Sequence, residues 1–168
     1  VSTTNEEYRP LRIALPGAPI PTDAVWDLRQ VSETEVELRW RGQGLEVVRS
    51  FSAGAGPYQL YQTVVVRNLG DDTRRTRLNV YAYHYVQRSD EGSSTFGARS
   101  PHMSQGLCRH EEEVERKDRT ALLTPHGYGN GVDFVAVESV YFVQALAASS
   151  EPASRCGLLS RDLGLDES

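Results

Sequence analysis

Four histidines are the side chains of this sequence best suited to acid–base or metal chemistry: His84, His102, His110 and His126. None of them has HExxH spacing or lies beside a CxxC pair, so the sequence does not predict a zinc site. His84 lies among tyrosines on a predicted strand, which favours a packed side chain over a catalytic one. His102 and His126 fall in predicted loops and are expected to be exposed. His110 precedes three glutamates, where we expect a solvated cluster of charges.

Motifs for nucleophilic catalysis or nucleotide binding are absent from the sequence, which has no GxSxG, P-loop or GxGxxG pattern. The segment 127–131 is rich in glycine, but it precedes a predicted strand and not a helix, so it lacks the helix dipole that favours phosphate. We interpret 125–131 as a turn. The sequence therefore predicts no catalytic residue, no cofactor-binding residue and no metal ligand.

The two cysteines, Cys108 and Cys156, allow two interpretations. In an oxidising compartment they could form a disulfide, whereas in the cytosol they would be independent thiols. A disulfide requires Cα atoms closer than about 7 Å, and the sequence alone leaves both alternatives open.

Composition and charge narrow the class of protein. The chain has 168 residues, 39% of them hydrophobic and 24% charged, which is typical of one soluble globular domain. Its net charge of −5, without a basic block, argues against nucleic acid as a partner. The first residues show no signal-peptide pattern and no initiator Met, which suggests a mature or excised piece. The most apolar segment, 132–148, contains Asp133 and Glu138, so we do not expect it to span a membrane.

Alternation of apolar and polar residues predicts β-strands separated by clusters of Gly, Pro and Asp. The segment Val36–Trp40 alternates strictly, and the turn at 42–44 should join it to a return strand at Val47–Phe51. Further strands are predicted at Tyr58–Arg67 and Thr76–Val86. Long strands joined by short turns predict an all-β fold with antiparallel sheets in a sandwich.

The second half of the chain is less regular. Residues 90–105 are small and polar, as in a long exposed loop. Residues 109–119 have mixed charge, and both a solvated edge strand and an exposed helical turn fit them. The β-branched and aromatic residues of Val135–Ala145 predict a strand buried on both faces, with Tyr141 and Phe142 pointing to opposite sides.

The order of these features from Glu37 to Tyr85, and again from Gly131 to Ala147, resembles the large periplasmic domain of the YidC membrane protein insertase of Gram-negative bacteria. After the alternating strand and turn at 36–44, residues 47–51 are similar to the family's K-x-F strand and 66–68 to its V-x-N element. Residues 95–98 occupy the place of its F-x-G loop. Residues 134–145 resemble the pattern W-x-x-x-x-x-x-Y-F-x-x-A, with Phe134 in place of the tryptophan.

The resemblance implies a β-supersandwich, the fold that is also found in galactose mutarotases and sugar-binding domains. It implies that residues 1–168 form a single periplasmic β-sandwich domain, truncated at its C-terminus. Such a domain is a non-catalytic, chaperone-like part of an inner-membrane insertase that helps membrane proteins insert and fold alongside the Sec translocon. The implied partners are client membrane proteins and the accessory component SecDF, and no residue of this sequence is assigned to that contact.

Two alternatives remain open. A carbohydrate-binding or mutarotase-like protein on the same fold would need a general acid and base, which His84, His126 and Glu138 could supply. A third possibility is a structural β-sandwich without a ligand.

Overall fold

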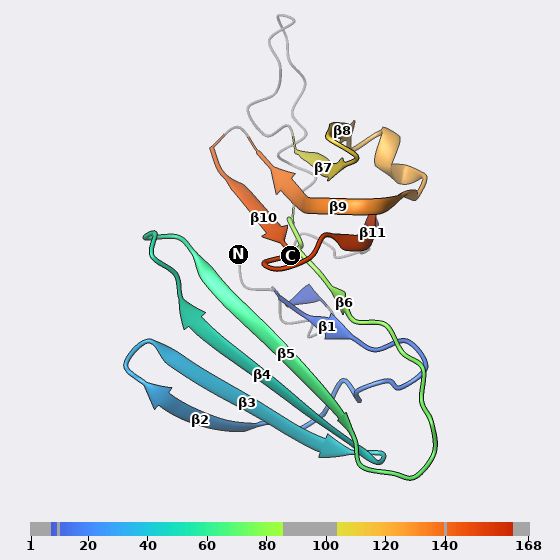
Figure 1. The fold of residues 1–168 in the computed structure, drawn as a ribbon. Helices are drawn as coiled ribbons and strands as arrows, with labels where there is room; N and C mark the ends of the chain where they lie inside the picture. The colour runs from blue at the N-terminus through green and yellow to red at the C-terminus, as the bar shows by residue number, and fades with distance from the viewer. Residues whose placement is uncertain (1–7, 10, 86–103, 140, 163–168) are drawn as a thin grey trace, which may run out of the picture. The chain divides into compact units, whose positions relative to one another are not determined.

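The computed structural model describes residues 8–9, 11–85, 104–139 and 141–162 (Figure 1). Within these residues the fold is all β, with antiparallel pairing in its larger sheets and a short 3₁₀-helix, η3 (Ala121–Leu123). This confirms the predicted all-β class with antiparallel sheets. The chain divides into two compact units, residues 13–79 and residues 1–12 together with 80–168, and each is described by itself.

The unit formed by residues 13–79 is built on a four-stranded antiparallel sheet in the order β2-β3-β4-β5 (Figure 1). Its strands are β2 (Asp27–Ser32), β3 (Glu35–Gly42), β4 (Leu45–Ala53) and β5 (Leu60–Asn68). The predicted strands at 36–40 and 47–51 are confirmed and lie within β3 and β4, and the strand predicted at 58–67 corresponds to β5, which begins at Leu60. Strict alternation identified β3, whose Val36, Leu38 and Trp40 point to one face while its charged residues point to the other.

The turn between β3 and β4 consists of Gln43 and Gly44, which lie between the paired residues Gly42 and Leu45. Both turn residues have left-handed backbone angles, with φ of 52° and 73°. A two-residue hairpin turn with positive φ at both positions matches the natural twist of the strands. Arg74 reinforces it by donating from Nη1 to the Gln43 carbonyl oxygen at 2.7 Å.

The core of this unit lies on the apolar face of the sheet, where Trp40, Leu45 and Val47 are buried. The segment between residues 13 and 26 covers them with Ile13, Leu15 and Ala18, and Trp26 packs against Trp40 with ring centroids 6.5 Å apart. Leu15 and Val47 are among the most deeply buried side chains of the described chain.

The prediction of a strand at Thr76–Val86 is largely wrong. Only Asn79 and Val80 form a strand, β6, which pairs with the equally short β1 (Ile13–Ala14). Beyond it, the Tyr81 N–H donates to the Arg12 carbonyl oxygen at 3.0 Å, but residues 81–85 form no further strand. Alternation was present in the sequence, but a strand also needs a partner long enough to pair with it. Val86 lies outside the described residues.

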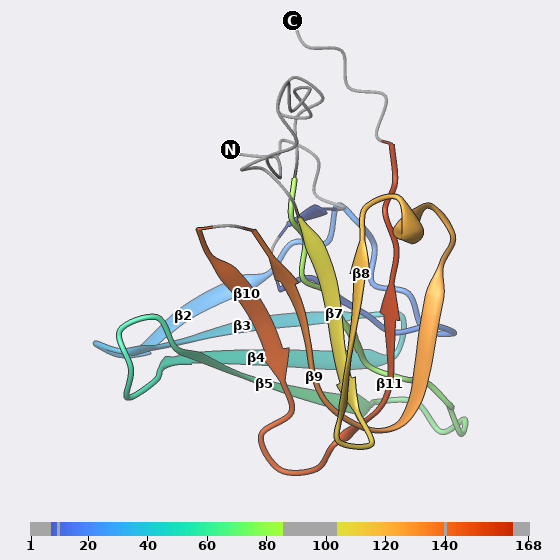
Figure 2. The same cartoon turned by 90° about the horizontal axis from the view of Figure 1, so that it is seen from above.

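The unit that contains residues 104–162 has a sheet in the order β10-β9-β7-β8, with β11 paired to the first half of β9 (Figure 2). Its strands are β7 (Gln105–His110), β8 (Glu113–Asp118), β9 (His126–Glu138), β10 (Val143–Ala147) and β11 (Ala153–Leu158). Of the two alternatives for residues 109–119, the edge strand is correct for residues 113–118, whereas residues 109–110 end β7 and residues 111–112 form a turn. Most of the loop predicted at 90–105 lies outside the described residues.

The turn predicted at 125–131 is wrong, because this segment begins the 13-residue strand β9. In place of a turn, β9 bends at Asn130 and Gly131, which have positive φ of 62° and 59°. Before the bend β9 pairs with β11, and after it β9 pairs with β7 and β10. The buried side chains that cluster in this unit come from β7, η3, β9 and β11: Cys108, Leu122, Val132, Cys156 and Leu158.

The single strand predicted at Val135–Ala145 is also wrong. The chain leaves β9 at Glu138, turns at Ser139 and returns as β10, so that Val143 pairs with Glu138 and Ala147 with Phe134. The composition correctly predicted strands, but it did not reveal the reversal between them. Among the described residues there is also no helix long and apolar enough to cross a membrane.

Candidate functional site

A disulfide between Cys108 and Cys156 resolves the alternative that the sequence left open. Their Cα atoms are 6.6 Å apart, within the range that a disulfide bridges. Cys108 lies opposite Val135 on β9, and Cys156 lies opposite Tyr128 on the same strand. The disulfide therefore links the strands that pair with the two halves of β9, and it is buried in the core of its unit.

The corner between β9 and β10 presents apolar side chains to solvent. Tyr141, Phe142 and Val143 are 76%, 59% and 61% exposed. The expectation that Tyr141 and Phe142 are buried on opposite faces of one strand is therefore wrong. We call these three residues the hairpin corner.

Ser139 holds the hairpin corner in place. Its N–H donates to the Phe142 carbonyl oxygen at 2.8 Å, and its hydroxyl oxygen accepts from the N–H groups of Tyr141 and Phe142 at 3.3 Å each. Serine hydroxyls commonly stabilise turns in this way. The Phe142 ring also packs edge-on against His84, with centroids 5.4 Å apart. Two exposed aromatic side chains therefore follow Ser139 at this reversal of the chain.

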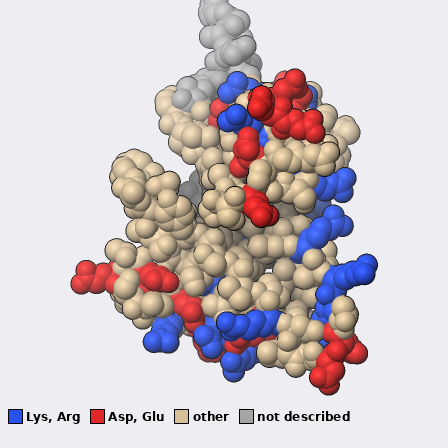
Figure 3. Space-filling view, viewed as in Figure 1, with Lys and Arg blue, Asp and Glu red and all other residues tan. Residues whose placement is uncertain are grey.

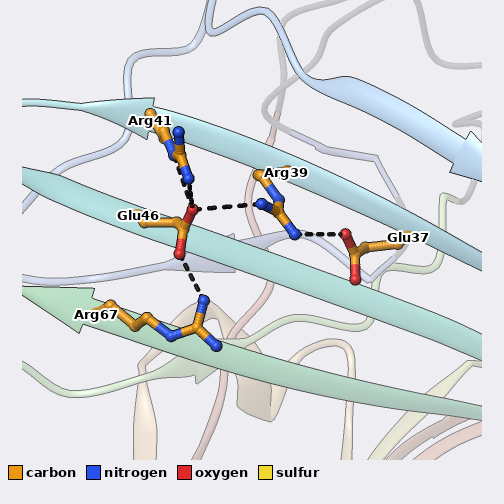
Figure 4. A network of polar contacts seen from close by, with 5 residues as sticks. All are labelled: Glu37, Arg39, Arg41, Glu46 and Arg67. Atoms are coloured by element: carbon orange, nitrogen blue, oxygen red, sulfur yellow. Dashed lines mark hydrogen bonds and ion pairs between the residues drawn. The ribbon is translucent and has the colours of Figure 1, made fainter.

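The charged face of the β2–β5 sheet carries a second cluster, centred on the buried carboxylate of Glu46 (Figure 4). Glu46 lies directly opposite Arg41 on β3 and Arg67 on β5. Arg41 Nε donates to Oε1 at 2.7 Å and Arg67 Nη1 to Oε2 at 2.6 Å, and Arg39 Nη1 lies 3.6 Å from Oε1. Glu37 in turn accepts from Arg39 at 3.0 Å.

The hydrogen bonds from Arg67 and Arg41 hold the pKa of the Glu46 carboxyl below its usual value. A carboxylate held ionised by several arginines is a poor proton donor or acceptor near neutral pH, so this cluster is suited to joining three strands and not to acid–base catalysis. Figure 3 shows blue and red atoms side by side over this sheet. The cluster was not predicted from the sequence, although the register of the β3–β4 hairpin places Arg41 opposite Glu46.

The described histidines lie in three different surroundings. His84 is packed, as expected, and burial lowers its pKa. His126 is half-buried and not exposed, since its Nε2 lies 3.2 Å from the Ala121 carbonyl oxygen. His102 lies outside the described residues.

The expectation of a solvated cluster holds for the glutamates after His110 but is wrong for the histidine itself. Glu111, Glu112 and Glu113 are exposed, whereas the imidazole of His110 stacks on Tyr128 with centroids 5.0 Å apart. Both His110 ring nitrogens are buried, and neither has a hydrogen-bond partner within the described part of the chain. We find no neighbouring arrangement that assigns this pair a chemical role.

The residues considered for a sugar site each contact a different neighbour. His84 packs on Phe142, His126 contacts the backbone of Ala121, and Glu138 lies 3.6 Å from Arg116 Nε. Nor does any group of three His, Cys, Asp or Glu side chains suited to a metal ion occur within the ranges that the structure describes. None of these observations favours the carbohydrate alternative.

Comparison with known proteins finds no relative of this chain. No protein-family model, no curated protein and no solved structure matches the chain.

Proposed function

We propose that this chain is a non-catalytic periplasmic domain of an inner-membrane protein insertase of the YidC type. In that role it assists membrane proteins as they insert and fold next to the Sec translocon. Its partners are client membrane proteins and the accessory component SecDF. The proposal includes the finer fold, a β-supersandwich like that of galactose mutarotases.

The observation that carries this proposal is the buried disulfide between Cys108 and Cys156. Disulfides that belong to a protein's core form and persist in oxidising compartments, among them the bacterial periplasm, and are rare in the cytosol. The bond therefore supports the location that the resemblance implies. A cytosolic enzyme or a cytosolic regulatory domain fits it poorly.

A second support is the surface that residues 134–145 present, although these residues do not form the single buried strand expected from the sequence. They form a hairpin whose exposed corner carries the Tyr141-Phe142 pair of the family's pattern. Exposed apolar side chains on a fixed turn are a feature of surfaces that interact with other molecules. In contrast, the arginines on the charged face of the β2–β5 sheet form ion pairs with Glu46.

The proteins that co-purify with the full-length gene product test this proposal. We would isolate it under mild detergent from membranes of its own host, with an affinity tag, and identify the proteins that accompany it. The proposal predicts recovery from the inner-membrane fraction together with Sec translocon components, SecDF among them. Recovery from the soluble cytosolic fraction, or from membranes without any translocon component, would contradict it.

A further inference from the structure

The strand β5 forms one edge of the β2–β5 sheet and is the longest edge strand in the described part of the chain (Figure 1). It pairs with β4 at nine consecutive positions without a register shift. Val64 and Val66 hold it further by packing against the core of the unit. β5 is therefore a well-formed extended strand, and at alternate residues its N–H and C=O groups point away from β4.

The other long edges have features that oppose pairing with a further strand. Five of the six residues of β8 are charged. β2 contains Asp27 and Arg29, and its register with β3 shifts between Gln30 and Ser32. β10 is only five residues long. Charges, bulges and short lengths are the usual means by which proteins keep sheet edges from pairing.

β5 differs from these edges in each respect. Its one charged residue is Arg67, which forms an ion pair with Glu46, and residues 60–66 contain neither charge nor proline. Leu60, Tyr61 and Val65 are 53%, 47% and 39% exposed. A long, regular and uncharged edge of this kind is a template on which another strand can pair.

The chemistry of a strand edge specifies what it binds. Outward N–H and C=O groups recur at every second residue, and another extended main chain presents groups with the same repeat. The exposed apolar side chains favour apolar neighbours on the added strand. A second copy of this chain is a poorer partner, because one strand from each side is much less than the roughly 20–30 residues a side of a stable interface. Two copies, each with a net charge of −5, would also repel each other.

We propose that the β5 edge binds an extended, apolar polypeptide segment, which adds a further strand to the four-stranded sheet. Peptide recognition by strand addition takes its affinity from main-chain hydrogen bonds and needs only one free edge. The inference rests on the proposed function only for the source of the segment, a client membrane protein that has not yet inserted.

Fluorescence anisotropy of a labelled peptide, titrated with the 168-residue chain, tests this inference. The probe alternates valine and threonine over about ten residues, the length of a long strand, with a lysine at each end for solubility. The control peptide has the same charges but two adjacent prolines at its centre, which remove one N–H donor from each of its edges. We expect the probe to bind and the proline peptide to show no measurable binding.

A pair of matched variants locates the binding on β5. Tyr61→Lys/Val65→Lys adds two charges at exposed positions of β5, and Leu28→Lys/Val31→Lys adds the same two charges at exposed positions of β2, the opposite edge of the sheet. The β5 variant should bind the probe roughly fivefold or more weakly, because it loses two apolar cross-strand contacts and gains edge charges. The β2 variant should bind like the wild type. Both should keep the wild-type circular dichroism spectrum, since the altered residues are exposed.

Amide hydrogen exchange, followed residue by residue by NMR, tests the main-chain geometry. In the free chain, protection along β5 should alternate, because only every second N–H donates to β4. Bound probe should also protect the amides in between. A contact made by side chains alone would leave those amides exchanging rapidly.

The inference is wrong if the probe does not bind, if the proline peptide or the folded β5 variant binds as tightly, or if the probe leaves the β5 amides unchanged. A chain that is dimeric by light scattering, with its β5 amides already protected, would assign the edge to a second copy instead. These outcomes are separate from the proposed function. Absence of peptide binding from a chain whose full-length protein co-purifies with the translocon would overturn the strand addition alone, and the reverse pair of results would overturn the function alone.

Discussion

Cys108 on β7 is bonded to Cys156 on β11, and each of these strands pairs with β9, Cys108 opposite Val135 and Cys156 opposite Tyr128. Asn130 and Gly131, which bend β9, lie between the two paired positions. The bond therefore joins the two strands that pair with either half of the bent β9, beside a core that includes Leu122 and Leu158. It also connects positions 48 residues apart, which restricts the unfolded chain considerably.

Removal of this bond should destabilise the unit that contains it. In the chain-entropy account, closing a loop of about 48 residues contributes about 4 kcal/mol to stability. We expect the double variant Cys108→Ser/Cys156→Ser to show a clearly lower urea midpoint by circular dichroism. The emission of Trp26 and Trp40, both in the unit of residues 13–79, reports separately on the other unit. An unchanged circular dichroism midpoint would contradict a structural role for the bond.

Glu46 should make stability depend on acid pH. Its carboxyl pKa in the folded chain is lowered by the hydrogen bonds from Arg67 and Arg41. Its contribution is therefore complete above the usual value of 4.5 and is lost as the pH falls through the folded-state pKa. Glu46→Gln should unfold at a lower denaturant concentration than the wild type at pH 7, and the difference should shrink towards pH 2. The exposed Glu113→Gln is the control, and a difference that does not vary with pH would argue against the mechanism.

Phe142 should contribute little to stability despite its size. Because its ring is mostly exposed, Phe142→Ala should change the free energy of unfolding by about 1 kcal/mol or less, mainly through the lost contact with His84. The buried Leu15→Ala should cost about 2–5 kcal/mol. Urea titration of both variants measures this contrast. A loss for Phe142→Ala as large as that for Leu15→Ala would show that the ring is buried.

The hairpin turn between β3 and β4 offers a stabilising substitution. Gln43 has a φ of 52°, and asparagine adopts this left-handed conformation more readily than glutamine. Gln43→Asn would create the Asn-Gly pair preferred in such turns and should raise stability by about 0.5–1 kcal/mol, as measured by thermal unfolding. Gly44→Ala at φ 73° is the opposite control and should lower stability. Destabilisation by Gln43→Asn would show that the turn has a different backbone conformation.

The sequence predicted the elements whose partners lie nearby along the chain. The hairpin of β3 and β4 was found because strict alternation from Val36 to Trp40 and the turn at 42–44 fix its register. The cluster around Glu46 was missed because its third strand brings in Arg67 from 21 residues away. Reversal of the chain at Ser139 was missed because its signal is a single hydroxyl that accepts from two backbone N–H groups.

The measurement that most directly tests the central claim is the insertion of a membrane protein in the host after depletion of the gene that encodes this chain. Pulse-labelled inner-membrane protein with a short periplasmic loop would be treated with protease in spheroplasts, so that cleavage reports a correctly inserted loop. We predict that depletion leaves most of the labelled protein uninserted and resistant to cleavage, and that the full-length gene product restores insertion. Undiminished insertion after depletion would contradict the proposed function.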